Sequence, residues 1–191
     1  MAKFMQITDL YNRYYSNILR YLKRFLSDSQ AEDLVQEVFI KADKGLDNFR
    51  GDASAKTWLY RIATNTLCDF LRSKRHRTDE AIIQIPVQEL EKYKDLLPTD
   101  FSIEQGAMRD EMNACVKAFI QRLPGNYSTV LVLRDLEGHT NQEVSDILGV
   151  SLETVKIRLY RARARLKVEL SQGCDFSFSS DNALQCQPKE E

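Results

Sequence analysis

The segment from Thr140 to Lys167 constrains the fold of this chain more than any other part of the sequence. Thr140 and Glu143 have the spacing of a capping box, in which each side chain binds a backbone N–H group at the start of a helix. Gly149 permits a left-handed turn that a Cβ atom would oppose, and Ser151 can cap a second helix. Two helices separated by such a short turn predict a helix-turn-helix.

The second helix of this pair has one apolar face and one basic face. Its apolar residues recur at intervals of three and four, as in a helix packed on one side: Leu152, Val155, Leu159, Ala162, Leu166 and Leu170. The basic residues are Lys156, Arg158, Arg161, Arg163, Arg165 and Lys167. A helix of this kind can read base edges in the major groove of DNA. A solvated basic surface is the alternative, because charge runs usually mark an exposed face.

The net charge of the chain conceals a strong segregation of charge. With 27 Lys and Arg against 28 Asp and Glu, the formal net charge is -1. A second basic cluster comprises Arg72, Lys74, Arg75 and Arg77. Acidic residues dominate between the two basic clusters, from Asp79 to Asp110. Because electrostatic binding depends on where charge lies, the near-neutral total does not exclude nucleic acid.

Apolar spacing along the rest of the chain is also helical, and the sequence predicts an all-α protein. The expected helices are Ile7–Leu26, Ala31–Ala42, Lys56–Lys74, Met108–Arg122 and Tyr127–Leu136. Periodicity fails after residue 77, where Pro86 and Pro98 interrupt an acidic stretch, so a linker is expected there. We therefore predict two small helical domains, 1–77 and 106–171, joined by an acidic linker, 78–105, and followed by a Cys-containing tail, 172–191, which is expected to be poorly ordered alone.

The third expected helix combines an apolar face with a basic end, which suits single-stranded as well as duplex DNA. The candidate contacts on it are Asn65, Asp69, Arg72, Lys74 and Arg75. Trp58 lies on the apolar face of this helix, so packing in the core is favoured for it over stacking on a base.

Several classes of protein are disfavoured. There is no Gly-rich phosphate loop, no cluster of His and no nucleophile with a partner base, so no catalytic residue, metal site or cofactor is expected. No signal peptide or membrane-spanning run is visible, and we expect a cytoplasmic protein without membrane contact. Cys68, Cys115, Cys174 and Cys186 form no CxxC pair, which argues against a disulfide framework.

Three stretches, read together, resemble the extracytoplasmic-function (ECF) sigma factors. They are AEDLVQEVFIKA (31–42), FRGDASAKTWLYRIATNTLCDFL (49–71) and LPGNYSTVLVLRDLEGHTNQEVSDILGVSLETVKIRLYRARARLK (123–167). The resemblance implies a protein that binds core RNA polymerase and promoter DNA, both duplex and melted non-template strand, and that an anti-sigma factor restrains. The first domain would bind the polymerase clamp and the -10 element, and the second would read the -35 element.

The same resemblance assigns roles to individual residues. Contacts to the polymerase clamp fall on Asp33, Gln36 and Glu37. The predicted contacts to the -10 element are Asn65, Asp69, Arg72, Lys74 and Arg75. The predicted contacts to the -35 element are Ser151, Thr154, Lys156, Ile157, Arg158, Tyr160 and Arg161. The chain departs from the family pattern at Ser145, where alanine is usual, and at Ile157, where a small polar residue is frequent.

Two alternative functions can be judged against the sequence by the residues that they require. A conventional repressor or activator could carry the same helix-turn-helix and bind duplex DNA as a dimer without polymerase. An enzyme acting on nucleic acid is disfavoured by the absences described above. In the tail, Cys174 and Cys186 could form a redox or metal-responsive element, but two ordinary thiols in a flexible segment fit the spacing better.

Overall fold

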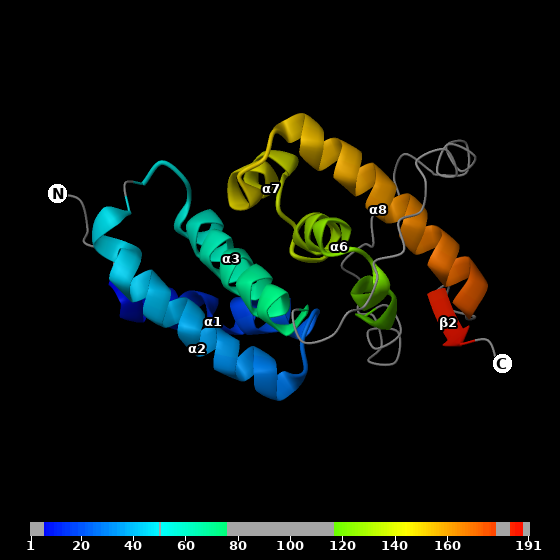
Figure 1. Cartoon of the computed structure of the whole chain (residues 1–191), viewed down its shortest axis with the longest axis horizontal. Coiled ribbons are helices and arrows are strands. Elements are labelled where there is room, and N and C mark those ends of the chain that lie inside the picture. The colour runs from blue at the N-terminus through cyan, green and yellow to red at the C-terminus, as the bar shows by residue number, and fades with distance from the viewer. Residues whose placement is uncertain (1–5, 50, 76–116, 179–183, 189–191) are drawn as a thin grey trace. The chain divides into compact units, whose positions relative to one another are not determined.

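The computed structural model describes residues 6–49, 51–75, 117–178 and 184–188, and side chains only within part of these ranges. Its elements are α1 (Ile7–Lys23), α2 (Asp28–Gly45), η1 (Leu46–Asn48), α3 (Ala55–Arg75), α6 (Gly125–Leu131), η3 (Val132–Leu136), α7 (Asn141–Leu148), α8 (Leu152–Gly173), β1 (Cys174–Phe178) and β2 (Leu184–Pro188). The described chain is dominated by helices, which confirms the predicted all-α class (Figure 1). The predicted linker, 78–105, lies outside the described residues.

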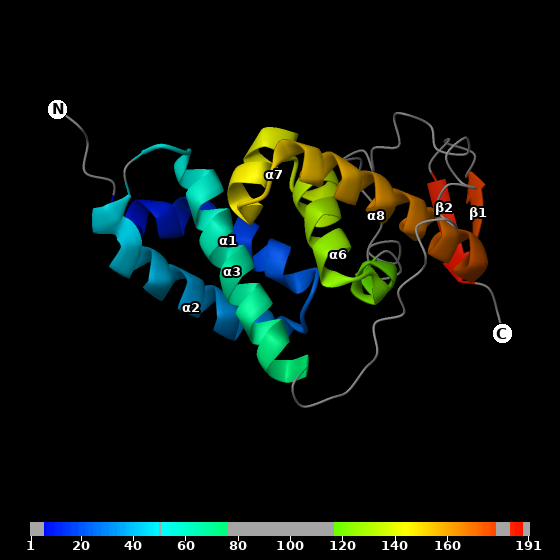
Figure 2. The same ribbon diagram turned by 45° about the horizontal axis from the view of Figure 1, so that its top comes forward.

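Helices α1, α2 and α3 pack against one another and share one core (Figures 1 and 2). Fully buried residues of the core come from all three helices: Ile18, Tyr21, Leu22, Val35, Val38, Leu59, Tyr60 and Ala63. The Tyr21 hydroxyl lies 2.9 Å from Thr64 Oγ1, and this hydrogen bond satisfies two polar groups inside the core. The apolar stripes expected from the sequence therefore face one another.

Local signals fix the boundaries of α2 and α3. Ser54 Oγ accepts a hydrogen bond of 3.1 Å from the backbone N–H of Thr57, in the manner of an N-cap. Trp58, in the first turn of α3, packs on Phe49, which follows η1 after the end of α2; the ring centroids are 5.0 Å apart. A Cβ atom at Gly45 would lie 3.3 Å from the Trp58 ring, so the indole closes tightly over the end of α2. This placement, half-buried, agrees with packing as the role of Trp58.

The chain divides into two compact units, each considered by itself. Among the described residues, α1, α2, η1, α3 and α7 fall in one unit, and α6, η3, α8 and the two strands in the other. Residues 117–122 are helical and precede Leu123, Pro124 and α6. In the second unit, buried residues come from Phe119 to Leu133 and from the inner face of α8.

Helix α6 ends in a π-helical turn, which the sequence analysis did not predict. The sequence predicts one helix over Tyr127–Leu136, whereas the structure has α-helix over Gly125–Leu131 and π-helix over Val132–Leu136. The Glu137 N–H donates to the carbonyl oxygen of Val132 at 2.9 Å, which is the i to i−5 bond of a π turn. The turn therefore carries one more residue than an α-helical turn would.

The tail also differs from the expectation of a poorly ordered segment. Strands β1 and β2 pair antiparallel, with Phe176 opposite Cys186 and Cys174 opposite Pro188 (Figure 2). This hairpin follows α8 directly in the chain.

Within the described residues, no helix is long and apolar enough to cross a bilayer.

Candidate nucleic-acid interface

The capping box predicted at the start of α7 is present. The Thr140 N–H donates to Glu143 Oε2 at 2.8 Å, and the Glu143 N–H donates to Thr140 Oγ1 at 3.2 Å. Gly149 ends the helix with φ of 63° and ψ of 35°, the left-handed conformation that favours glycine. These features confirm the local geometry that the sequence predicted for the first helix and the turn.

The turn between α7 and α8 is also held by a residue whose role the sequence did not reveal. Ser145 Oγ donates to the carbonyl oxygen of Val150 at 2.6 Å, and the Val150 N–H donates to the carbonyl oxygen of Ser145 at 3.3 Å. Ser145 is buried, so an unpaired hydroxyl would be costly there. The serine that replaces the usual alanine therefore fastens the turn that leads into α8.

Helix α8 presents two distinct faces along its first four turns. The buried face comprises Val155, Leu159, Ala162 and Leu166. The exposed -35 candidates are Ser151, Lys156, Ile157 and Tyr160, and the half-buried ones are Thr154, Arg158 and Arg161. Lys156 Nζ lies 3.7 Å from the Glu153 carboxylate, but both groups are exposed and such a pair contributes little. The Lys156 ammonium is therefore available to a phosphate or a base.

Two arginines of the predicted basic face turn inward instead. Arg163 donates from Nε to Asp135 Oδ2 at 2.9 Å and from Nη2 to Asp135 Oδ1 at 2.6 Å. The Asp135 side chain is almost fully buried, and Arg163 is half-buried. Arg165 is buried as well. The basic surface available to DNA on α8 is thus narrower than the sequence indicated, because a partner on η3 holds Arg163.

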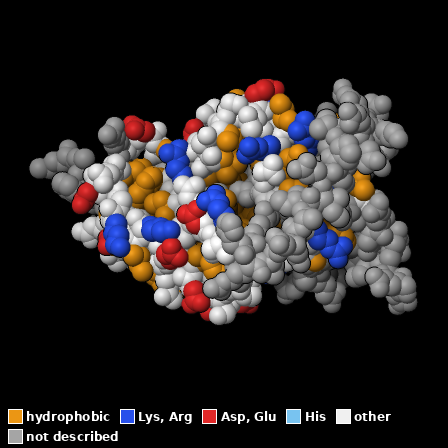
Figure 3. Space-filling view, in the orientation of Figure 1, with side chains coloured by type: hydrophobic (Ala, Val, Ile, Leu, Met, Phe, Trp, Pro, Cys, Tyr) orange, Lys and Arg blue, Asp and Glu red, His pale blue; other side chains and the backbone are white. Residues whose placement is uncertain are grey.

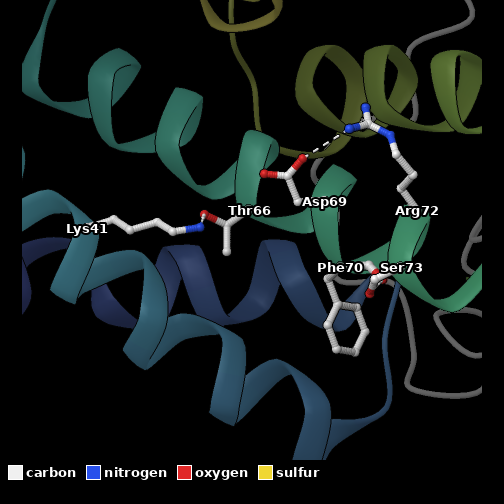
Figure 4. Close-up of polar contacts among 6 residues, drawn as sticks. All are labelled: Lys41, Thr66, Asp69, Phe70, Arg72 and Ser73. Carbon is white, nitrogen blue, oxygen red and sulfur yellow. Dashed lines mark hydrogen bonds and ion pairs between the residues drawn. The ribbon is translucent and has the colours of Figure 1, made fainter.

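Helix α3 carries a stripe of exposed polar residues, here called the α3 stripe: Asn65, Cys68, Asp69 and Arg72. Their spacing of three and four places them on one side of the helix. Arg72 Nη1 lies 3.3 Å from Asp69 Oδ1 (Figure 4). The side chains of Lys74 and Arg75 lie outside what the structure describes. Three of the five predicted -10 contacts are therefore exposed together on one face.

Cys68 belongs to the α3 stripe, although the sequence analysis gave it no role. Although Cys68 reaches the surface, neighbouring atoms partly desolvate its thiol, which raises its pKa; the positive charge of Arg72 opposes that effect, and the carboxylate of Asp69 adds to it. We therefore expect a smaller thiolate fraction at neutral pH than for an ordinary cysteine, and this fraction should depend on the charges of Asp69 and Arg72.

The third predicted surface lies on α2. Asp33, Gln36 and Glu37 are all exposed, as the sequence indicated. Ile40 follows at the same spacing and is 55% exposed, so an apolar residue continues this polar face. Lys41 holds Glu37 at 2.8 Å and also donates to Thr66 Oγ1 on α3 at 3.2 Å (Figure 4). Ile40 carries no signal of its own in the sequence, because an isoleucine in an amphipathic helix is ordinarily assigned to the core.

Charge of both signs is spread over the visible described surface. In the view of Figure 3, Lys and Arg side chains lie among Asp and Glu side chains rather than in one continuous patch. Hydrophobic side chains also reach the surface in this view. On this face, the described side chains therefore form no single large basic field.

Comparison with known proteins identifies two domains. Residues 10–77 match the family model of sigma-70 region 2, and residues 113–166 match that of sigma-70 region 4. The first match covers α1 to α3, and the second covers α6 to most of α8.

Relatives of similar length support both matches. The RNA polymerase sigma-H factor of Pseudomonas aeruginosa is 38% identical over 152 residues, covering 79% of each chain. The sigma factor SigZ of Bacillus subtilis is 33% identical over 171 residues, covering 89% of each. The ECF sigma-E factor of Escherichia coli is 32% identical over 151 residues, covering 79% of each.

Solved structures share the fold. CnrH, in a complex with the cytosolic domain of CnrY, is similar with a TM-score of 0.62 and 24% identity, covering 87% of this chain and 88% of that one. The sigma factor RpoE of Bartonella quintana, in a complex with the anti-sigma factor NepR, gives 0.62 and 21%, covering 86% and 96%. The resemblance seen in the sequence is thereby confirmed, and the chain belongs to the ECF group of RNA polymerase sigma factors, which direct transcription initiation.

Proposed function

We propose that this protein binds core RNA polymerase and selects promoters by reading the -35 element with α8 and the -10 element with α3. The observation that carries the proposal is the exposed face of α8, with Lys156, Ile157 and Tyr160 together on the first turns of a helix that follows a fixed turn. Residues at the start of such a helix are the ones that reach base edges in the major groove.

The α3 stripe supports the second half of the proposal. Asn65 offers an amide that can donate and accept hydrogen bonds with a flipped base, and Arg72 offers a guanidinium for a phosphate or a base face. The exposed ion pair between Arg72 and Asp69 costs little to open, so the arginine can exchange its partner for a phosphate. We infer that the displaced non-template strand lies along this stripe.

The exposed face of α2 fits a protein partner rather than DNA. Asp33, Gln36 and Glu37 lie on the same face of α2 as an exposed apolar residue, Ile40, and protein interfaces combine polar and apolar side chains in this way. Two carboxylates on this face would repel a phosphate backbone. We infer that this surface docks on the polymerase clamp and that an anti-sigma factor competes for it. The similar sigma factor of Bartonella quintana has been solved in a complex with an anti-sigma factor, which supports a partner of that kind.

Run-off transcription with purified core polymerase tests the proposal. The full-length protein should confer start-site selection on a library of genomic promoters, and core polymerase alone should not. Absence of selection on every promoter would contradict the proposal. Tight dimeric binding of duplex DNA without polymerase would instead favour a conventional repressor or activator.

Single substitutions then separate the three surfaces. Lys156→Ala should weaken binding of the upstream element, Asn65→Ala should reduce opening of the promoter, and Ile40→Ser should weaken binding to core polymerase. Asn12→Ala, an exposed amide on α1, is the matched control for Asn65→Ala. A premelted promoter should rescue Asn65→Ala only in part, because the substitution removes a contact to the open strand as well.

A further inference from the structure

The outer face of α8 exposes apolar side chains that its packing does not require. Five large hydrophobic residues are exposed in the described part of the chain, and three of them, Leu152, Ile157 and Tyr160, lie on the first nine residues of α8. Ile157 is 44% exposed and Tyr160 is 39% exposed. They are three residues apart and so are neighbours on the helix surface.

Neither the core nor helix formation accounts for Ile157. The buried stripe of α8 runs through Val155 and Leu159, and Ile157 lies on the opposite side of the helix. A β-branched residue also forms a helix less readily than Lys, Arg or Ala at an exposed position. An isoleucine at this position therefore costs helix stability without adding to the core.

The major groove contains one apolar group among the base edges, the C5 methyl group of thymine. Lys156 precedes Ile157 and is exposed, so an ammonium that can bind the DNA backbone stands beside the apolar side chain. Extending the function proposed above, we propose that Ile157 reads a thymine methyl group in the -35 element and that Tyr160 flanks the same contact. The chain therefore prefers a thymine at one position of that element.

Replacing thymine with deoxyuridine tests this contact directly, because it removes only the methyl group and leaves base pairing intact. Binding of holoenzyme to the upstream duplex would be measured with each thymine replaced in turn. The wild-type protein should lose about three- to fourfold in affinity at one position, which is the contribution of one buried methyl group. The other thymines should show little effect.

Two variants assign the effect to Ile157. Ile157→Ser should bind the thymine duplex more weakly and lose nothing further on the deoxyuridine duplex, as expected of a coupled pair in a double-mutant cycle. Ile157→Val keeps an apolar side chain and should keep the sensitivity to deoxyuridine. Lys156→Ala leaves the side chain of Ile157 in place, so it should weaken binding of the thymine and deoxyuridine duplexes by the same factor, and it serves as the control for a contact that does not involve the methyl group.

Two outcomes would overturn the inference, and they differ. In the first, promoter-specific binding is present, but the change from thymine to deoxyuridine lowers the affinity of Ile157→Ser and of the wild-type protein by the same factor at every position. The methyl contact is then wrong, and the proposed function stands. If the wild-type holoenzyme shows no promoter-specific binding at all, the proposed function fails, and this inference fails with it.

Discussion

Asp135 accepts two hydrogen bonds from Arg163, at 2.9 and 2.6 Å, and this bidentate pair joins η3 to α8. The carboxylate is almost fully buried, whereas the guanidinium keeps some contact with solvent. Planar two-point pairs of this kind fix orientation as well as distance. The bidentate pair therefore holds the Arg163 guanidinium against η3 within its own domain, and we expect Arg163 to support α8 rather than to bind phosphate.

Removing Arg163 should destabilise the protein without changing how its binding depends on salt. Arg163→Ala leaves a buried carboxylate unpaired, and the free energy of unfolding in urea should fall by about 2 kcal/mol. By contrast, Arg161→Ala should remove one phosphate contact. The salt slope, which is the slope of the logarithm of the binding constant of holoenzyme for the upstream duplex against the logarithm of salt concentration, should then fall in magnitude by about 1. A salt slope for Arg163→Ala equal to that of Arg161→Ala would show that Arg163 binds phosphate after all.

Gly149→Ala should cost about 1 kcal/mol of folding free energy, measured by thermal or urea unfolding. The cost comes from the backbone alone, because φ is 63° and no heavy atom lies within 4 Å of an added Cβ atom. Gly125→Ala is the matched control, since its Cβ atom also meets open space and its φ is not positive. Equal stability of Gly149→Ala and Gly125→Ala would contradict the left-handed assignment.

Ser145→Ala should lower the free energy of unfolding by about 1 kcal/mol, because the carbonyl of Val150 loses the hydroxyl that donates to it. Alanine fills nearly the same space, so start-site selection should remain that of the wild-type protein. Urea unfolding and run-off transcription measure the two effects separately. A changed promoter preference in Ser145→Ala would mean that the turn controls which bases α8 reads.

The thiol of Cys68 should react slowly with iodoacetamide at neutral pH, because burial raises its pKa and reduces the thiolate fraction. The variant Cys115→Ser, Cys174→Ser, Cys186→Ser leaves Cys68 as the one thiol of the chain. In this variant, the pH at which the alkylation rate reaches half its maximum should lie above that of an ordinary thiol. Arg72→Ala removes the charge that favours the thiolate and should raise the midpoint further. A midpoint below the ordinary value would contradict this prediction.

Oxidation should not join Cys174 to Cys186 within one molecule. The register places Cys186 opposite Phe176 and Cys174 opposite Pro188, so the two cysteines are diagonal and not directly paired. Diagonal Cα atoms lie about 7 to 8 Å apart, beyond the usual range for a disulfide. Mass spectrometry after diamide treatment would detect the bond. Its formation would revive a redox role for the tail and would require the strands to slip.

The sequence predicted those features that depend on neighbours along the chain. The capping box of Thr140 and Glu143, the left-handed Gly149 and the start of α8 after Ser151 all have local signals, and all are present. The long helix expected over Lys56–Lys74 appears as Ala55–Arg75 for the same reason.

Features that depend on tertiary contacts or on the exact geometry of a turn have no signal in the sequence. Arg163 was placed on the basic face because its partner, Asp135, is 28 residues away and no spacing rule connects them. In the sequence, Ser145 is only a departure from a family pattern, because its hydrogen bond to the carbonyl of Val150 depends on the geometry of the turn. The roles of the -10, -35 and clamp residues stay predictions, although the exposure of Asn65, Lys156 and Glu37 agrees with them.

The π-helical turn over Val132–Leu136 makes the length of this segment as important as its composition. Deleting one residue there would restore α-helical pitch and rotate one side of the segment by about 100° relative to the other. Leu133 would leave the core, and Asp135 would no longer meet Arg163. Point substitutions in this stretch change one contact each, whereas a single in-frame deletion or insertion would displace all of them at once.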